Sequence, residues 1–201
     1  VLEERLDENF YGPDSEGHGK GRLSRQLLSN GQETRYLEYY VGTDRPKKVA
    51  IYQSGALVKT VTYSSDGLTV STVTLPDGSE IRYVAYWPNT AEPKTIENYR
   101  SGVFLNRIEY YLSGKTAKIT LPNGDYTEYF ENQNRKTSYS ASSRIFTQFL
   151  SENFYGTDAD GYGRGRKSSE VFPDGKSIRY FYVNTTTERL SGKSFYQDAK
   201  L

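Results

Sequence analysis

The sequence predicts an all-β protein, an antiparallel meander of repeated hairpins that forms an extended or spiralling sheet such as an open solenoid, a tube or a shell segment. Three observations predict this fold. Glycine-containing turns recur at short, nearly constant intervals, segments of alternating hydrophobicity lie between them, and residues 1–57 recur at 145–201. Self-similarity at a fixed period is typical of repeat architectures.

The long repeat spans residues 1–144 and aligns with its second copy without a gap. The segment ENFYG at 8–12 returns at 152–156, and about 20 of the 57 aligned pairs are identical. We therefore expect residues 1–201 to form one continuous array, built from this long repeat and from finer strand-turn units of roughly 11–12 residues. The chain contains no Met, so we expect it to be a fragment or a processed segment of a longer array.

Glycines mark the predicted turns. Asn-Gly and Asp-Gly pairs favour two-residue hairpin turns, in which both central residues have positive φ. The glycines assigned to turns are Gly31, Gly55, Gly67, Gly78, Gly102, Gly114, Gly124 and Gly175.

The segments between the turns are rich in strand-forming residues. The predicted strands cover residues 57–63, 68–75, 80–87, 104–111, 115–121 and 125–130. In the third of these, Ile81, Tyr83, Ala85 and Trp87 fall on one face, which is the period of a half-buried strand. Segments such as 68–75 change parity midway, so the sequence does not say which face is buried. Only 2–6 and 144–150 are candidates for helix.

The composition narrows the class of protein. Nineteen tyrosines carry much of the apolar surface, and the mean hydropathy is −0.77. The net charge is +1 and the basic residues are scattered, which argues against nucleic acid as a partner. The sequence holds no apolar run long enough to span a bilayer, so we expect no membrane insertion, and we expect no signal peptide within it. The absence of cysteine excludes disulfides and thiol chemistry.

One motif points to a family. A basic residue after glycine is followed by Pro/Ser-Asp/Asn-Gly and then by a tyrosine-containing step of the form Arg/x-Tyr-x-Tyr. Residues 163–182 carry the complete step, 19–40 and 114–132 carry looser versions, and 75–86 carry the second half. This pattern resembles the YD repeats of Rhs, toxin-complex and teneurin proteins. The resemblance implies a long spiralling β-sheet that can enclose a cargo polypeptide, in a protein that is secreted or displayed at the cell surface.

Two related loops are candidates for calcium. Asp158 and Asp160 precede a glycine at alternate positions, and Asp14 and Glu16 occupy the same places in the first copy. Carboxylates in this pattern can bind a hard cation; the alternative is a solvated glycine-rich loop. The residues that follow lack the bidentate Glu of an EF-hand. The only histidine, His18, is replaced by tyrosine in the second copy, and we predict that the chain is not an enzyme and has no other cofactor.

The tyrosines allow two interpretations. They form cross-strand ladders that hold a thin sheet together, or they stack against a sugar, for which Tyr83, Tyr86 and Trp87 are the candidates.

Three functions follow. The first is a non-enzymatic structural protein, a segment of an extracellular or cell-surface tube, filament or stalk that self-associates through its terminal strands or neighbouring repeats. The second is a YD-repeat shell around a cargo or toxin polypeptide. The third is a glycan-binding adhesin module.

Overall fold

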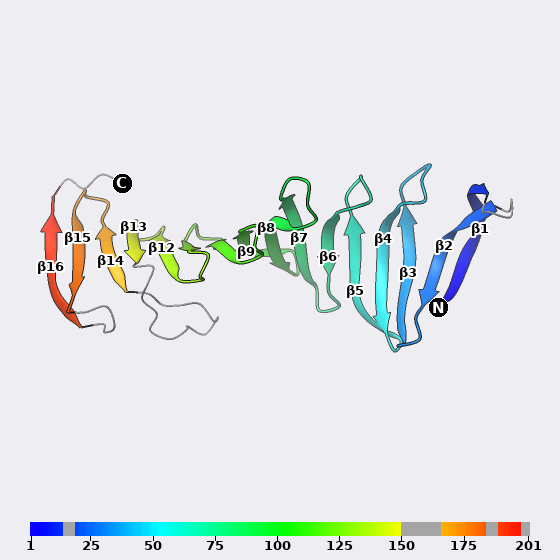
Figure 1. Cartoon of the computed structure of the whole chain (residues 1–201), viewed down its shortest axis with the longest axis horizontal. Helices are drawn as coiled ribbons and strands as arrows, with labels where there is room; N and C mark the ends of the chain where they lie inside the picture. Colours follow the sequence, from blue (N-terminus) through cyan, green and yellow to red (C-terminus); the bar gives the residue numbers. More distant parts are fainter. Residues whose placement is uncertain (14–18, 150–165, 184–188, 198–201) are drawn as a thin grey trace. The chain divides into compact units, whose positions relative to one another are not determined.

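Sixteen strands and no helix make up the described part of the chain, and they hydrogen-bond in chain order from β1 to β16 in an antiparallel meander (Figure 1). The structure is a computed structural model that describes residues 1–13, 19–149, 166–183 and 189–197. The predicted all-β fold is confirmed. The strands are β1 (Leu2–Pro13), β2 (Gly19–Leu27), β3 (Gln32–Tyr39), β4 (Pro46–Gln53), β5 (Ala56–Tyr63), β6 (Val70–Thr74), β7 (Ser79–Tyr86), β8 (Pro93–Arg100), β9 (Val103–Tyr110), β10 (Thr116–Thr120), β11 (Tyr126–Tyr129), β12 (Arg135–Ser140), β13 (Ile145–Phe149), β14 (Lys167–Val171), β15 (Ser177–Tyr182) and β16 (Leu190–Tyr196).

Both helix candidates are strands. Residues 2–6 lie in β1 and residues 145–149 form β13. Both segments pair with a neighbouring strand, β1 with β2 and β13 with β12 and β14, and these pairs satisfy the backbone without a helix.

The chain divides into two compact units, which we describe separately. Unit 1 contains Val1–Val84 and Glu97–Phe104, and unit 2 contains Ala85–Ile96 and Leu105–Leu201. Among the described residues, each strand contacts only the strands next to it in sequence. Each strand is therefore stabilised by its immediate neighbours, as in other repeat proteins.

The turns are of two kinds, which corrects the expectation of a single kind. Two positive φ angles occur together at Ser54-Gly55 and at Ser101-Gly102, the geometry of a two-residue hairpin turn. Most other turns have a positive φ at their last residue alone. In these turns, the N–H of the first residue donates to the carbonyl of the residue four positions later, and its own carbonyl accepts the N–H of the residue three positions later. The N–H of Leu75 donates to Ser79, and the carbonyl of Leu75 accepts from Gly78. This is a three-residue loop with a bulge. The aspartate before the glycine stays in the ordinary φ region and accepts a backbone N–H, as Asp77 does from Ser79 at 2.9 Å.

Bulged turns of the same pattern occur at Gly114 and Gln133 as well, and one subset recurs with a period of four strands. The turns of this subset lie at Gly31, Gly78, Gly124 and Gly175, at the start of β3, β7, β11 and β15. The carbonyl oxygen of Gly31 accepts the N–H of Ser54 at 3.0 Å, and that of Gly78 accepts the N–H of Ser101 at 3.0 Å. Each of these bulged turns in unit 1 thus contacts the two-residue turn that lies two strands further along.

The parity change in 68–75 is a β-bulge. Tyr63 pairs with Val70 while Thr62 pairs with Thr72, so Ser71 is the extra residue. Its hydroxyl donates to the carbonyl of Thr62 at 3.1 Å. Leu68 lies in the turn before β6, where it is 79% exposed.

Unit 1 has one apolar face. A single cross-strand row joins Tyr36, Val49, Val61, Val73 and Ile81, because each is directly opposite the next. Val49 and Val61, at the centre of this row, are 3% and 5% exposed. The neighbouring row on the other face is polar and runs through Arg35, Ala50, Thr60, Thr74 and Glu80. The apolar face of unit 1 is therefore the one that carries Val49 and Val61, which the sequence alone did not determine.

Candidate functional site: the polar face and the last strand

Arginine–tyrosine pairs recur along the chain. The guanidinium of Arg35 lies 4.3 Å from the centre of the Tyr52 ring, and that of Arg82 lies 4.0 Å from the Tyr99 ring. In unit 2, Arg179 lies 4.9 Å from the Tyr196 ring. Each pair joins two consecutive strands, and the separation of its members along the chain is the same in every case. A cation over an aromatic face is attracted to the ring quadrupole, so the pair links neighbouring strands.

Glu33 lies between Arg35 and a further arginine, Arg25. Its carboxylate is almost buried, and its Oε1 accepts from Nε of Arg35 at 2.6 Å and from Nε of Arg25 at 2.8 Å. Hydrogen bonds from Arg35 and then from Arg25 lower the pKa of Glu33 against the effect of burial. Arg25 also reaches Glu4 at 3.0 Å. The cluster connects β1, β2 and β3.

A second charged cluster connects β14 and β15 in unit 2. Tyr180 donates a short hydrogen bond to Glu170, whose other oxygen accepts from Nζ of Lys167 at 2.5 Å. Burial and then the bond to Glu170 raise the pKa of Tyr180 to about 12. Burial raises the pKa of Glu170, but the bonds from Lys167 and Tyr180 outweigh it and the net shift is downward.

Other tyrosines bond to the backbone of a second strand. The hydroxyl of Tyr40 donates to the carbonyl of Tyr63 at 2.6 Å, and that of Tyr111 donates to the carbonyl of Tyr129 at 2.7 Å. In both cases the donor follows one strand and the acceptor belongs to the strand after the next one. These bonds link a tyrosine side chain to the backbone two strands away and differ from the side-chain ladders between adjacent strands that the sequence predicts.

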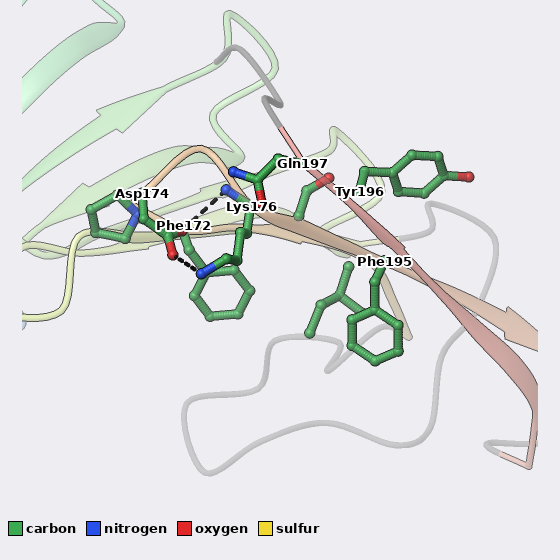
Figure 2. Close-up of a pocket in the computed structure, with 9 residues that line it drawn as sticks. Phe172, Asp174, Lys176, Phe195, Tyr196 and Gln197 are labelled. Carbon is green, nitrogen blue, oxygen red and sulfur yellow. Dashed lines mark hydrogen bonds and ion pairs between the residues drawn. The ribbon is translucent and has the colours of Figure 1, made fainter.

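An open pocket of about 670 Å³ lies at β15 and β16 and at the turn before β15. Figure 2 shows the rings of Phe172 and Phe195 on the same side of the strands, while the ring of Tyr196 points to the other side. At the rim, Nζ of Lys176 contacts Oδ2 of Asp174 at 2.6 Å (Figure 2). Phe195 is 74% exposed. The pocket is thus an apolar shelf along the last strand.

The calcium candidates Asp14, Glu16, Asp158 and Asp160 lie outside the described residues. Within the described ranges, no group of three or more His, Cys, Asp or Glu residues is arranged to hold a metal ion. His18 also falls outside these ranges.

The sugar-stacking candidates belong to different units. Tyr83 is in unit 1, whereas Tyr86 and Trp87 are in unit 2. The indole of Trp87 is half-buried, and the ammonium of Lys94 lies 4.8 Å from its centre. One face of this ring is therefore occupied by a cation.

The predicted turn glycines all have the backbone conformation that favours glycine. Their φ angles are 79° at Gly31, 82° at Gly55, 67° at Gly67, 82° at Gly78, 79° at Gly102, 77° at Gly114, 87° at Gly124 and 80° at Gly175. At the turn after Phe130, Gln133 takes the place of glycine with a φ of 68°.

Sequence reasoning missed the arginine–tyrosine pairs, although a signal was present. The repeated motif places arginine in one strand, and a tyrosine follows at a constant distance along the chain, at Tyr52, Tyr99 and Tyr196. A constant spacing between two residue types in a meander indicates that they occupy neighbouring strands.

The fold and these recurrent contacts define an antiparallel β-repeat protein. No family model matches the sequence, and no curated protein matches it. Among solved structures, the Photorhabdus luminescens Tc holotoxin pore is similar at 13% identity and a TM-score of 0.33, over 96% of this chain and 10% of that chain. The TM-score is too low for the likeness to decide family or function. No helix in the described residues is long and apolar enough to cross a membrane.

Proposed function

We propose that this chain is a structural segment of an extended β-repeat array, outside the cell or at its surface, and that it performs no catalysis. Its role is mechanical, because each strand transmits its register and orientation to the next. The array grows by addition of further strand-turn units to the ends of the meander.

The recurrence of the same contacts carries this proposal. The pair formed by Arg35 and Tyr52 returns at Arg82 with Tyr99, and again at Arg179 with Tyr196. The bond between turns at Gly31 returns at Gly78. Contacts that repeat between neighbours give a stability that sums along the array. The same contacts can form in the middle of a long array as in a single segment. Each of them joins two residues of the chain itself and requires no ligand.

Electron microscopy of tandem arrays tests the proposal. Because residues 145–201 align with 1–57, several copies of residues 1–144 joined head to tail preserve the repeat across every junction. We expect uniform fibres or tubes whose axial repeat corresponds to one copy of residues 1–144. The matched control carries one extra residue within β4 of each copy, between Val49 and Ala50, which moves the rest of that strand to the opposite face and should abolish the regular repeat. Discrete, compact particles without an axial repeat from the uninterrupted array would contradict the proposal.

A shell around a cargo polypeptide is the second candidate, and the apolar row of unit 1 favours it. Among the described strands of unit 1, none lies outside the sheet that carries Tyr36, Val49, Val61, Val73 and Ile81, so unit 1 has no second layer over this row. Such a face is suited to the inside of a closed wall. Closed hollow particles in the same images would select the shell over the open array.

A glycan-binding adhesin is the remaining alternative, and it rests on Trp87. Retention of the chain on a polysaccharide resin, lost in Trp87→Ala, would favour it. Because the ammonium of Lys94 occupies one face of the indole, Lys94→Ala should then strengthen retention by uncovering that face. Equal elution of all three proteins in the void volume would count against glycan binding.

A further inference from the structure

A second pocket lies in unit 2, on one face of the strands β10 to β13. Its volume is about 500 Å³, which is within the range of small-molecule sites. Thr127, Ser138 and Thr147 are directly opposite one another on three consecutive strands, so their side chains form one row across the floor of the pocket. Thr147 is 7% exposed. The centre of this pocket is therefore a row of hydroxyl groups.

The pocket coincides with a departure from the repeat. In three places the structure shows which residue is opposite the third residue after the turn glycine, and these residues are Ile51 on β4, Phe195 on β16 and Ser138 on β12. Serine thus replaces a large apolar side chain and leaves space above the sheet. Positions at which a protein breaks its own pattern are expected at functional sites.

The turn between β12 and β13 departs from the repeat as well. In unit 1, β4 and β5 are joined by the two-residue turn Ser54-Gly55, and Ser54 donates its N–H to the carbonyl of Gly31. The connection from β12 to β13 has four residues. Its Ala141 donates instead to Oδ1 of Asp125 at 2.7 Å. Two features that differ from the repeat therefore meet at one pocket.

The polar lining of the pocket is mainly hydroxyl groups. Five serine and threonine residues line it: Thr127, Ser138, Ser140, Ser143 and Thr147. Within the described ranges, no protein group hydrogen-bonds to the side chains of Thr127, Ser138 or Thr147. A hydroxyl group both donates and accepts, so this row suits a ligand whose polar groups also do both. Ile119, Leu121 and Ile145 offer apolar contacts beside the row.

We propose that this pocket binds a neutral saccharide unit, whose hydroxyls exchange hydrogen bonds with Thr127, Ser138 and Thr147. A sugar ring carries several hydroxyls that donate and accept, together with C–H groups that suit the apolar residues of the pocket. Among the described residues that line it, Asp125 and Arg135 carry the charges, one of each sign, so the lining does not favour an anion or a cation. This inference goes beyond the proposed structural role.

The surrounding strands support this choice of ligand. Each of β10 to β13 is paired on both edges, so the pocket offers no open backbone edge of the kind that an extended polypeptide uses. The rings of Tyr126 and Tyr139 lie on the other face, because these residues alternate with Thr127 and Ser138. They stack there at 5.3 Å, which holds β11 against β12 and fixes the hydroxyl row in place.

Ligand-observed NMR tests the site on the full 201-residue chain. The probes are maltose, cellobiose, lactose and N,N′-diacetylchitobiose, each titrated in saturation-transfer experiments. We expect saturable binding of at least one of these disaccharides. Absence of saturable binding by all of them overturns the inference. Equal binding of a peptide of alternating glycine and serine also overturns it, in favour of a polypeptide ligand.

Ser138→Ile locates the site. It introduces the residue type that β4 carries at Ile51 and fills the pocket, so it should weaken binding about tenfold or more. The midpoint of urea denaturation should stay unchanged or rise, because the variant restores the pattern of the repeat. Ser169→Ile is the matched control, since Ser169 lies on the neighbouring strand β14 and on the other face; we expect less than about a twofold change in binding. Equal effects of the two variants overturn the inference.

Removal of single hydroxyls tests the contacts themselves. Thr127→Val and Thr147→Val should each weaken binding about threefold to tenfold, because each removes one hydrogen bond without filling the pocket. If Ser138→Ile does not fold, these two variants decide the question, and unchanged binding in both overturns the inference. Trp87→Ala should leave binding unchanged; loss in this variant with full binding in Ser138→Ile would assign the sugar to Trp87 and overturn the inference. Tandem arrays that form fibres in spite of such a result would leave the proposed function standing.

Discussion

Gly78→Ala tests the turn contacts that we regard as the basis of the array. Gly78 has a φ of 82°, and an added Cβ would lie 3.4 Å from Oγ of Ser101. The steric contact is tolerable, so the main cost is the left-handed backbone conformation of a residue with a side chain. That cost is about 1–2 kcal/mol. We therefore expect the free energy of unfolding to fall by this amount.

Two further glycines calibrate the result. At Gly67 the added Cβ would lie 2.8 Å from both Cβ and Cδ of Arg45, whose guanidinium donates to the carbonyl of Asp66 at 2.8 Å. Movement of Arg45 also loses this bond, so Gly67→Ala should cost about 2–4 kcal/mol. Gly192, in β16, lacks a positive φ and has no atom within 4 Å of the added Cβ. Gly192→Ala should be neutral or stabilise the chain by up to about 1 kcal/mol.

Urea denaturation followed by far-ultraviolet circular dichroism measures all three variants against the unmodified chain. A shift of the midpoint at constant slope gives the change in stability, and each kcal/mol corresponds to about 2–4 °C in a thermal scan of a chain of this size. The reasoning predicts the order Gly67→Ala, then Gly78→Ala, then Gly192→Ala. It is refuted if Gly78→Ala and Gly192→Ala agree within about 0.5 kcal/mol, the usual scatter of surface substitutions.

The remaining predictions concern the apolar row, the Tyr180 cluster and an aspartate turn. Val49→Ala and Val61→Ala should each lower the free energy of unfolding, measured by urea denaturation, by about 1.5–2.5 kcal/mol. The double variant should lose less than the sum of the two, because the side chains lie opposite each other. Leu68→Ala, at a 79% exposed position, should change the free energy of unfolding by no more than about 0.5 kcal/mol. In the folded chain the pKa of Tyr180 is raised to about 12, so the unfolded chain loses this proton at a lower pH than the folded chain does. Stability should therefore fall as the pH rises above the ordinary tyrosine pKa and through the raised one. Tyr180→Phe should make this fall shallower, and Glu170→Gln should move the Tyr180 transition in a tyrosinate absorbance titration to lower pH; an unchanged titration would contradict the assignment. The hydrogen bond from the N–H of Ser79 lowers the pKa of Asp77 in the folded chain. At acid pH the carboxylate therefore binds protons more readily in the unfolded chain than in the folded one. Stability should fall as the pH drops below the ordinary aspartate pKa and through the lower pKa of the folded state. Asp77→Asn keeps an acceptor for that N–H and should make the acid-side loss in thermal scans shallower, whereas an unchanged slope would show that the turn carboxylate does not contribute.

The repeat and its turns could be predicted because both depend on local information. Alternation of apolar residues predicts a strand directly, as at Ile81 and Tyr83. Glycine in a turn predicts a positive φ, as at Gly78. The kind of turn was predicted less well. Whether the residue before the glycine also takes a positive φ depends on how many residues the flanking strands leave for the loop, so Ser54 does and Asp77 does not.

The sequence by itself determined the all-β class, the long repeat and the positions of its turns, since these follow from spacing and from the conformations open to single residues. Only the tertiary structure decided the register, and register depends on the pairing of distant segments. The structure places Tyr36, Val49, Val61, Val73 and Ile81 in one row. It also shows that the parity change near Ser71 is a β-bulge. It also brought each arginine of the recurrent pairs onto a tyrosine of the next strand. A shift of one residue in any of these pairings would move every side chain of a strand to the other face, and no local pattern excludes that shift.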